Sequence, residues 1–310
     1  MSLNSNDVAN ALFITPEDVR SLVRNKKLKF ERKLPGGGNL EFSTKNICDY
    51  VKKNDIKRDC TTISLANIKG GVGKTLSTIC ISSVLKECGY RVLVIDCDKQ
   101  ANMTAYFIEE TSDLDMPNAS DIFFGRFSDK VIYETKFGVH IIPSNLQFAE
   151  IMDITAVTKY TNLYNFIETI KDDYDFILID TPPDILLPVE ASLIASHFVF
   201  CVIQPDYASF LGIKYLYDLI DNCNKSFVPP DCSFGGCFFN QVLPNRKLDK
   251  QFLENQEQIA SNVRILENYI THSNSYREFQ AFREPIMDGL KDRYINSFVS
   301  LTLEILSIVR

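Results

Sequence analysis

Six short apolar runs recur along residues 59–310, and they predict the strands of one sheet. Continuous Val, Ile, Leu and Phe, rather than an apolar–polar alternation, are typical of strands buried on both faces. The runs are Thr61–Asn67, Val92–Asp96, Val139–Pro143, Phe176–Asp180, Phe198–Gln204 and Phe234–Asn240. The segments between them are long enough for crossover helices, such as Leu76–Cys88. We therefore predict an α/β fold with a mostly parallel sheet covered by helices.

Residues 1–58 have a helical pattern of apolar positions. Helices are expected over Asn6–Phe13 and over Pro16–Asn25. Thr15 fits the N-cap of the second helix, because Pro16 suits the first helical position and Asp18 follows the cap by three residues. A third helix is expected to begin after a Ser43 cap and to run through Asn54.

Two strand-like segments interrupt these helices. They are Leu28–Lys33 and Leu40–Phe42, and the glycine-rich residues 34–39 between them predict a hairpin. Two helices joined by a short turn and followed by a hairpin are the plan of a winged helix-turn-helix. We therefore predict a DNA-binding domain over residues 1–58 and a second domain over residues 59–310, with the polar stretch Lys52–Asp59 as the linker.

Charge divides the chain in the same place. Residues 1–58 hold 12 Lys and Arg against 7 Asp and Glu, a net charge of +5, whereas the remaining residues hold 21 against 33, a net charge of −12. A basic segment on an acidic body favours a polyanion as the partner of the basic segment.

Composition excludes several other classes of protein. A chain of 310 residues that is 45% hydrophobic and 24% charged is not mostly disordered. No apolar stretch reaches the ~18 residues of a membrane span, and residues 1–10 lack a signal-peptide core, so a cytoplasmic protein is expected. The nine cysteines are scattered without a Cys-x-x-Cys pair, which predicts reduced thiols; Cys232 and Cys237 are the one candidate pair for a metal.

The strongest chemical signal is the glycine-rich segment Lys69–Thr75, which directly follows the first predicted body strand and precedes a helical pattern. That context is the one a phosphate-binding P-loop requires. Glycines let the backbone turn N–H groups toward phosphate oxygens, Lys74 would reach the β- and γ-phosphates, and Thr75 would bind Mg²⁺. The strict pattern G-x-x-x-x-G-K-[ST] is not met, because Ile68 stands at its first glycine.

Acidic residues end two of the predicted strands. Asp96 and Asp98 follow the strand Val92–Asp96, and Asp180 ends Phe176–Asp180. The carboxyl ends of parallel strands are where α/β proteins bind ligands, so an acid there can hold the Mg²⁺ shell. The alternative is that Asp96 and Asp98 only cap the helix that follows.

These motifs together resemble the ParA/MinD family of deviant Walker ATPases. The resemblance rests on Lys69–Thr75, Asp96–Gln100 and Asp180–Pro183, and it continues through Val202–Tyr207, Leu211–Gly212, Phe239–Gln241 and Tyr276–Ile286. It covers residues 60–310. The basic N-terminal domain resembles the MerR-like helix-turn-helix found on longer plasmid-partition ParA proteins. The resemblance implies a P-loop NTPase fold that binds ATP and Mg²⁺ and hydrolyses ATP as a nucleotide-sandwich homodimer.

The resemblance also assigns roles by position. Lys69 would be the signature lysine that reaches the partner subunit's nucleotide, Lys74 would keep its ordinary P-loop role, and Asp98 would position the attacking water. Asp96 and Asp180 would join Thr75 in supporting Mg²⁺. The nucleotide-binding residues would be Lys69, Gly70, Gly71, Val72, Gly73, Lys74, Thr75 and Leu76, with Pro205 and Asn240 as candidates for the adenine pocket. This sequence departs from the family at Leu76, where Thr or Ser is common, and at Lys99, which replaces a Pro.

DNA contacts are expected chiefly in the N-terminal domain. Base-edge or phosphate contacts are expected from Arg20, Ser21 and Arg24, and phosphate contacts from Lys27, Lys29 and Lys33. The alternative is a solvated basic face on a small interaction module. The body offers two further basic clusters, one at Arg246, Lys247 and Lys250 and one at Arg277 and Arg283, between which the sequence does not choose.

Several functions remain open at this point. The first is a nucleoid-associated partition ATPase that binds DNA non-specifically in its ATP state. Such a protein would bind an operator through its N-terminal domain and would be activated by a centromere-binding ParB-like protein. The second is a membrane-positioning ATPase like MinD; it is disfavoured because Tyr294–Arg310 is apolar-rich with Arg310 as its one positive charge and reads as a packed core helix. The others are a relative of the nitrogenase iron protein and a transcriptional repressor for which ATP is only a ligand.

Overall fold

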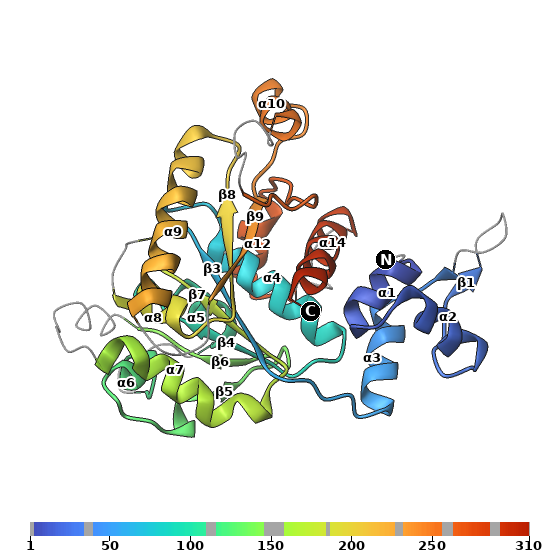
Figure 1. Ribbon diagram of the computed structural model, residues 1–310, viewed down its shortest axis with the longest axis horizontal. Helices are drawn as coiled ribbons and strands as arrows, with labels where there is room; N and C mark the ends of the chain where they lie inside the picture. The colour runs from blue at the N-terminus through green and yellow to red at the C-terminus, as the bar shows by residue number, and fades with distance from the viewer. Residues whose placement is uncertain are drawn as a thin grey trace.

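A seven-stranded sheet forms the centre of the computed structural model, which describes residues 3–33, 40–109, 116–145, 158–183, 187–226, 232–255, 263–285 and 292–309. The strand order is β5-β6-β4-β7-β3-β8-β9 (Figure 1). The strands are β3 (Thr61–Ala66), β4 (Val92–Asp96), β5 (Tyr133–Glu134), β6 (His140–Ile142), β7 (Phe176–Asp180), β8 (Phe198–Ile203) and β9 (Ser233–Phe239). All neighbouring pairs are parallel except β5 with β6. The predicted α/β fold with a mostly parallel sheet is therefore confirmed.

The apolar runs locate the strands closely. β4 and β7 have the predicted bounds, and the other four are one or two residues shorter or shifted by one residue. The short edge strand β5 was missed, because two residues carry no apolar run. Strand β3 lies between β7 and β8, which places the segment after it near the middle of the sheet.

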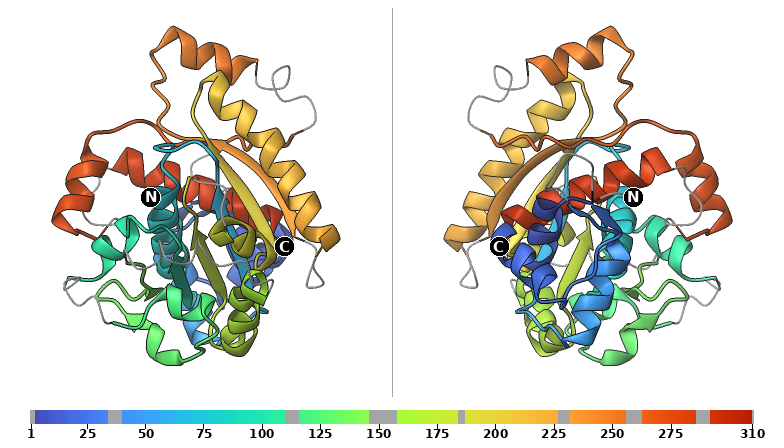
Figure 2. Two further views of the ribbon diagram at one scale, coloured as in Figure 1. Left: turned by 90° about the vertical axis from the view of Figure 1, so that its left-hand side faces the viewer. Right: turned by 90° about the vertical axis from the view of Figure 1, so that its right-hand side faces the viewer.

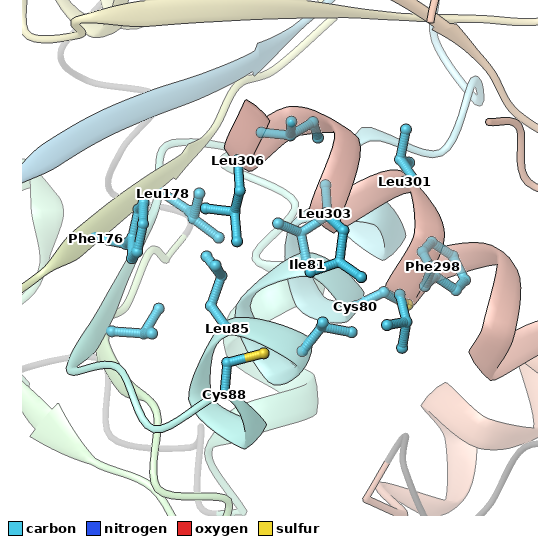
Figure 3. Close-up of a cluster of buried hydrophobic side chains, with 14 of the residues drawn as sticks. Cys80, Ile81, Leu85, Cys88, Phe176, Leu178, Phe298, Leu301, Leu303 and Leu306 are labelled. Carbon is cyan, nitrogen blue, oxygen red and sulfur yellow. The ribbon is translucent and has the colours of Figure 1, made fainter. Parts of the chain in front are cut away.

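Helices cover both faces of the sheet because successive strand residues point to opposite sides. Phe176 and Leu178 pack with α4 and α14 on one face, whereas Ile177 and Ile179 pack with α7 and α8 on the other. Figure 3 shows the first cluster, in which Ile81 and Leu85 of α4 face Leu303 and Leu306 of α14. The helices of this part of the chain are α4 (Lys74–Glu87), α5 (Asn102–Phe107), α6 (Ala119–Phe123), α7 (Thr158–Ile170), α8 (Leu187–Ile194), α9 (Tyr207–Ser226), α10 (Lys247–Glu254), α12 (Ser275–Phe282) and α14 (Asp292–Ile308), with short 3-10 turns at Asp129–Val131 and Lys171–Asp173.

The predicted core helix near the C-terminus is α14. Phe298, Leu301 and Leu306 are all at most 1% exposed. Among the residues that the structure describes, no helix is long and apolar enough to cross a membrane. All nine cysteines are free thiols. His197 is half-buried, and its Nδ1 accepts the Thr62 N–H at 2.9 Å.

The N-terminal segment, here residues 3–53, contains the helices α1 (Ser5–Leu12), α2 (Pro16–Arg24) and α3 (Thr44–Lys53) and an antiparallel pair, β1 (Arg32–Lys33) with β2 (Leu40–Glu41). Thr15 caps α2 together with Asp18, and Ser43 caps α3, so both predicted caps are confirmed. The first strand was predicted too long, since residues 28–31 are not in a strand. The glycine-rich tip at residues 34–39 lies outside the described residues. Lys52 and Lys53, predicted to open the linker, belong to α3.

This segment packs against the body, here residues 61–309. Helix α1 contacts α14, and α3 contacts α4 (Figures 1 and 2). One continuous apolar cluster runs from Leu3 in the segment to Val309 at the end of α14. At Gly89, just after α4, a Cβ would lie 3.2 Å from the backbone Cα of Cys48 in α3. The backbones of the segment and the body therefore approach as closely as a glycine permits.

Gly89→Ala tests this close approach, and Gly125→Ala is its matched control. Both glycines have positive φ, +95° and +75°, so each alanine costs about 1–2 kcal/mol of backbone strain. Only at Gly89 does the new Cβ meet backbone, whereas at Gly125 it meets the side-chain nitrogen of Asn162 at 3.5 Å. We expect Gly89→Ala to lower the free energy of unfolding by about 1–3 kcal/mol more than Gly125→Ala in denaturant titrations. Equal losses would contradict the close packing of α3 on the body.

Candidate phosphate-binding site

The loop between β3 and α4 has the conformation of a phosphate-binding turn. Gly71 and Gly73 have φ of +73° and +94°, and Gly73 directly precedes the first residue of α4. A Cβ on Gly73 would lie 2.1 Å from Nδ2 of Asn240, so that amide would have to move, and the positive φ adds backbone strain for any other residue. The free N–H groups and the positive end of the helix dipole at the start of α4 attract anions. The loop therefore offers backbone donors at the carboxyl edge of the central strand.

A cavity of about 370 Å³ opens at this loop. Seven of the predicted site residues line it, namely Gly70, Gly71, Gly73, Lys74, Thr75, Leu76 and Asp98. Six residues not predicted as site residues complete the wall, namely Asn102, Pro183, Gln241, His272, Ser273 and Tyr276. Six other predicted residues are not among the lining residues: Lys69, Val72, Asp96, Asp180, Pro205 and Asn240.

Lys74 is buried at the base of the cavity. The residue is only 6% exposed, and its Nζ donates to the carbonyl of Asn67 at 3.0 Å. A buried ammonium is stable only beside acceptors and negative charge. Asp180 supplies part of that charge, because Lys74 acts to lower the pKa of this carboxyl group. Lys74 therefore already stands where a bound polyphosphate would meet it.

Asp180 is the most exceptional group of the site. Burial, reinforced by the charge of Asp96, raises the pKa of Asp180 well above its ordinary value, against the opposing effects of Thr75 and Lys74. Its Oδ1 is buried without a hydrogen-bond partner among the described residues. Such an orphaned oxygen beside a threonine hydroxyl fits Mg²⁺, which prefers oxygen ligands and completes its shell with water and phosphate. The residues present therefore fit a magnesium–nucleotide complex.

Asp96 and Asp98 have different environments. Asp96 is fully buried, and its oxygens accept the Asp98 N–H, the Thr104 N–H and the Thr104 hydroxyl at 2.8–3.1 Å. Burial raises the pKa of Asp96 to about 6, although these hydrogen bonds oppose the shift. Asp98 faces the cavity, and its Oδ1 accepts the Gln100 N–H at 2.9 Å. Asp96 thus shapes the loop that presents Asp98, and its expected part in the Mg²⁺ shell stays a prediction.

Lys69 points away from the cavity of its own chain. Its Nζ donates to Oε1 of Gln204 at 2.7 Å and to Oδ2 of Asp206 at 2.5 Å. The other oxygen of Asp206 accepts the Ser209 N–H at the start of α9, at 2.9 Å. Both members of the ion pair are about one-third exposed, so a competing anion can reach the ammonium. Lys69 is therefore held beside the end of β8 by an ion pair that a competing anion can open.

Three side-chain amides hold the loop from behind. Asn240 donates to the carbonyl of Val72 at 2.8 Å, and Gln241 donates to the carbonyl of Gly71 at 2.8 Å. Gln204 donates to the same Gly71 carbonyl at 3.3 Å and to Gln241 at 2.7 Å. With its carbonyls fixed outward, the loop turns its N–H groups toward the cavity. The amide of Asn240 is turned to the loop and the residue is 1% exposed, and Pro205 is buried. Their predicted contact with adenine stays a prediction.

The residues predicted to bind DNA lie in the N-terminal segment, on or near α2 and β1 (Figure 1). Arg20, Arg24, Lys27 and Lys29 are exposed, and Ser21 is half-buried. Lys33 belongs to β1, and its side chain lies outside the described part of the chain. Arg32, within the same basic run, pairs with Glu41 across the strand pair.

Of the two basic clusters of the body, the first lies on α10, where Arg246, Lys247 and Lys250 are exposed. Arg246 pairs there with the buried Asp249. The side chain of Arg277 lies outside the described residues, so the second cluster is not compared with the first.

Known proteins are similar to this chain in the part that carries the phosphate-binding loop and the acidic strand ends. The family described as an AAA domain, AAA_31, matches residues 60–230. The sporulation initiation inhibitor protein Soj of Bacillus subtilis is 30% identical over 166 residues, which is 51% of this chain and 64% of Soj. A ParA family protein of Mycoplasma genitalium is 25% identical over 270 residues, which is 79% of this chain and 97% of that protein.

Two solved structures have a fold similar to that of this chain. A chain of Borrelia burgdorferi B31 described as a plasmid partition protein, bound to AMPPNP, superposes with a TM-score of 0.66 at 25% identity and covers 79% of this chain and 97% of that one. A cobyrinic acid a,c-diamide synthase of Mycobacterium smegmatis with a bound ATP analogue and magnesium gives a TM-score of 0.64 at 22% identity, over 72% of this chain and 93% of that one, and shows the fold alone.

Asp180→Asn tests the electrostatic origin of the site. The pKa values of Asp96 and Asp180 are raised, so both groups keep their protons to higher pH in the folded state than in the unfolded state. Their ionisation therefore lowers the free energy of unfolding as pH rises above about 4, and for Asp96 this loss occurs up to and beyond its folded-state pKa of about 6. We expect Asp180→Asn to stabilise the metal-free protein at pH 8 and to have little effect near pH 4. Urea denaturation across this range, without nucleotide or Mg²⁺, measures the difference.

Asp175→Asn is the opposite control. Asp175 is a buried acid at the start of the same strand, but it pairs with Arg91 at 2.9 Å, so its loss should destabilise the protein at pH 8 by about 1–3 kcal/mol. If Asp180→Asn also destabilised the metal-free protein at pH 8, the ionised carboxylate of Asp180 would not be a group that lowers the stability of the folded protein.

Proposed function

Because the chain belongs to the ParA/Soj family of AAA-domain ATPases, which the match over residues 60–230 shows, we propose that it is a DNA-partitioning ATPase. In this proposal Mg²⁺ and ATP bind at residues 69–76, ATP is hydrolysed by a nucleotide-sandwich dimer, and the ATP-bound dimer holds DNA. The observation that carries the proposal is the cavity at the β3–α4 loop. The buried Lys74 and Asp98 line this cavity, and the orphaned oxygen of Asp180 is buried behind it, in the electrostatic reach of Lys74 and Thr75.

The residues of the chain divide the work of hydrolysis. The N–H groups of the loop and the ammonium of Lys74 would hold the β- and γ-phosphates and offset the charge that develops as the terminal phosphoryl group leaves. Thr75 and Asp180 would hold Mg²⁺, which when bound neutralises phosphate charge. Asp98 faces the cavity and would orient the attacking water. Asp96 would act through the Asp98 loop, whose N–H it accepts.

Lys69 supports the dimer in this proposal. An ammonium that does not line its own cavity is free to serve the cavity of a second subunit once its ion pair with Asp206 opens. Tyr207, next to Asp206, is 72% exposed at the same edge and offers apolar surface for that subunit. The site would then be complete only in the dimer, which makes nucleotide state and dimer state one switch.

The N-terminal segment supports a DNA-binding role. We propose that residues 1–58 form a MerR-like winged helix-turn-helix domain joined to the ATPase domain, residues 59–310. Helices α1 and α3 contact the body, whereas α2 and the β1–β2 pair lie on the outer side (Figure 1). The exposed Arg20, Arg24, Lys27 and Lys29 are therefore open to an operator, and Ser21 lies on the same helix as the two arginines. Lys33 would add a phosphate contact from β1. Operator binding would let the protein regulate its own operon, while a ParB-like centromere-binding protein would stimulate hydrolysis.

A repressor for which ATP is only a ligand is the second candidate, favoured by the same outer basic face. A MinD-like role fits less well, because the apolar face of α14 is buried in the core and offers no surface to a membrane. Turnover separates the two main candidates, since only the partition ATPase needs hydrolysis.

Lys69→Gln and Lys74→Gln separate the two lysines. We expect Lys74→Gln to abolish ATP binding, because the buried lysine meets the phosphates of its own chain. Lys69→Gln should bind ATP within a few-fold of wild type but lose turnover by about 100-fold or more, since it removes a cation from the transition state. Equilibrium binding of a fluorescent ATP analogue and phosphate release measure the two properties.

Asp206→Asn is the control for the broken ion pair. It removes the same pair as Lys69→Gln but keeps the lysine, so turnover should equal or exceed that of the wild type. If Asp206→Asn lost turnover as fully as Lys69→Gln, the defect would come from the ion pair rather than from a missing cation.

Arg24→Ala tests the DNA-binding face. It should weaken operator binding by about 1–3 kcal/mol if Arg24 reads a base, or lower the salt dependence of binding by about one unit of slope if it meets a phosphate. Fluorescence anisotropy at several salt concentrations, with ATP present, measures both. Lys214→Ala, an exposed lysine on α9, should change neither. Unchanged binding and slope for Arg24→Ala would place DNA recognition elsewhere.

A further inference from the structure

Arg58 lies among three aromatic rings at the seam between the N-terminal segment and the body. Its guanidinium carbon is 3.2 Å from the ring centre of Phe13, 4.8 Å from that of Phe176 and 5.8 Å from that of Tyr90. Phe13 ends α1, Phe176 begins β7, and Tyr90 follows α4. One side chain of the connecting residues 54–60 thus contacts both the segment and the body.

The chemistry of this contact favours a fixed position for the cation. Nη1 of Arg58 is buried and has no hydrogen-bond partner among the described residues. Burial lowers the pKa of Arg58, while Tyr90 and Asp175 oppose that shift. A desolvated guanidinium over aromatic faces is attracted by the ring quadrupoles, which offsets part of its lost hydration. Arg58 is therefore stable here only while all three rings stay in place.

Neighbouring contacts bring the same surfaces together. Phe13 adopts a left-handed conformation, φ +58°, which ends α1, and its ring lies 6.5 Å from that of Phe176. The Tyr90 hydroxyl donates to the carbonyl of Ala11 in α1. Tyr90 and Phe176 also meet edge to face at 5.1 Å. The connection between Lys53 and Thr61 is therefore anchored by packing.

A large cavity lies beside the contacts of Arg58, between the N-terminal segment and the body. The space beside the seam measures about 1030 Å³ and is lined by residues from both sides, including Leu12, Phe13, Arg58, Tyr90 and His197. It contains no residue of the phosphate-binding loop and lies at the amino ends of the strands. Because this part of the seam is not filled by side chains, the few contacts around Arg58 hold this side of the segment.

We propose that Arg58 is an interdomain clamp, which fixes the N-terminal segment to the body so that both move as one unit rather than as two tethered domains. The clamp lies at the far end of α4, the helix that begins at Lys74. Its 14 residues span about 21 Å. The basic outer face of α2 is consequently held at a set distance and orientation from the phosphate-binding loop, and a rearrangement of α4 would move the two together.

Hydrogen exchange on the full chain tests the clamp. Arg58→Gln removes the guanidinium and keeps a shorter, neutral polar side chain, and Lys57→Gln removes the adjacent exposed charge. We expect Arg58→Gln to raise amide exchange at least tenfold in residues 9–14 and 54–60. Exchange in β3 and ATP binding should stay as in the wild type. Lys57→Gln should leave every segment unchanged.

Phe13→Leu provides the second variant. It keeps apolar volume but removes the ring nearest to Arg58, so it should release the same residues as Arg58→Gln, and the double variant should add little. Wild-type exchange at the seam in Arg58→Gln, or equal effects of Lys57→Gln, would overturn the clamp. A uniform loss of protection throughout residues 3–53 would overturn it as well, since Arg58 would then be needed for the segment to fold.

Discussion

The buried ammonium of Lys74 is the constraint on which the site depends. A lysine that is 6% exposed has lost most of its water, so carbonyl and carboxylate oxygens must replace it. The carbonyl of Asn67 and the buried carboxylate of Asp180 serve this purpose. In turn, the lysine offsets part of the cost of burying Asp180. The charges of Lys74 and Asp180 do not fully satisfy each other, because one oxygen of Asp180 has no hydrogen-bond partner among the described residues. The site therefore suits a ligand that brings both phosphate and a divalent cation.

The parallel sheet makes this balance possible by bringing distant segments to one edge. Asp96 and Asp180 are register partners on β4 and β7, and Leu65 of β3 pairs with Asp180. Motifs that stand far apart in the sequence therefore end at the same level, directly beside the loop after β3. Strand β8, on the other side of β3, places Gln204 and Asp206 where they reach Lys69. The same geometry leaves the amino ends of the strands for the N-terminal segment.

The sequence predicted the parts of the molecule whose structure is decided locally. Continuous apolar runs located the strands, and the caps at Thr15 and Ser43 located two N-terminal helices, because each signal acts within a few residues. Glycines followed by Lys74 and Thr75 located the cavity for the same reason. The amides of Gln204 and Gln241 gave no such signal, since their role comes from the position of the Gly71 carbonyl, more than 130 residues away in the chain. Arg58 was placed in a polar linker because a run of charged residues does not reveal aromatic rings brought to it by α1, β7 and the end of α4.

Binding of ATP by the intact chain is the most direct test of this account. Equilibrium dialysis against labelled ATP, with Mg²⁺ and then with a chelator, measures stoichiometry and the dependence on the cation together. We expect one saturable ATP per chain with a dissociation constant below about 1 mM, and weaker binding when Mg²⁺ is removed. No retention of ATP at that concentration, or retention that does not depend on the cation, would contradict it.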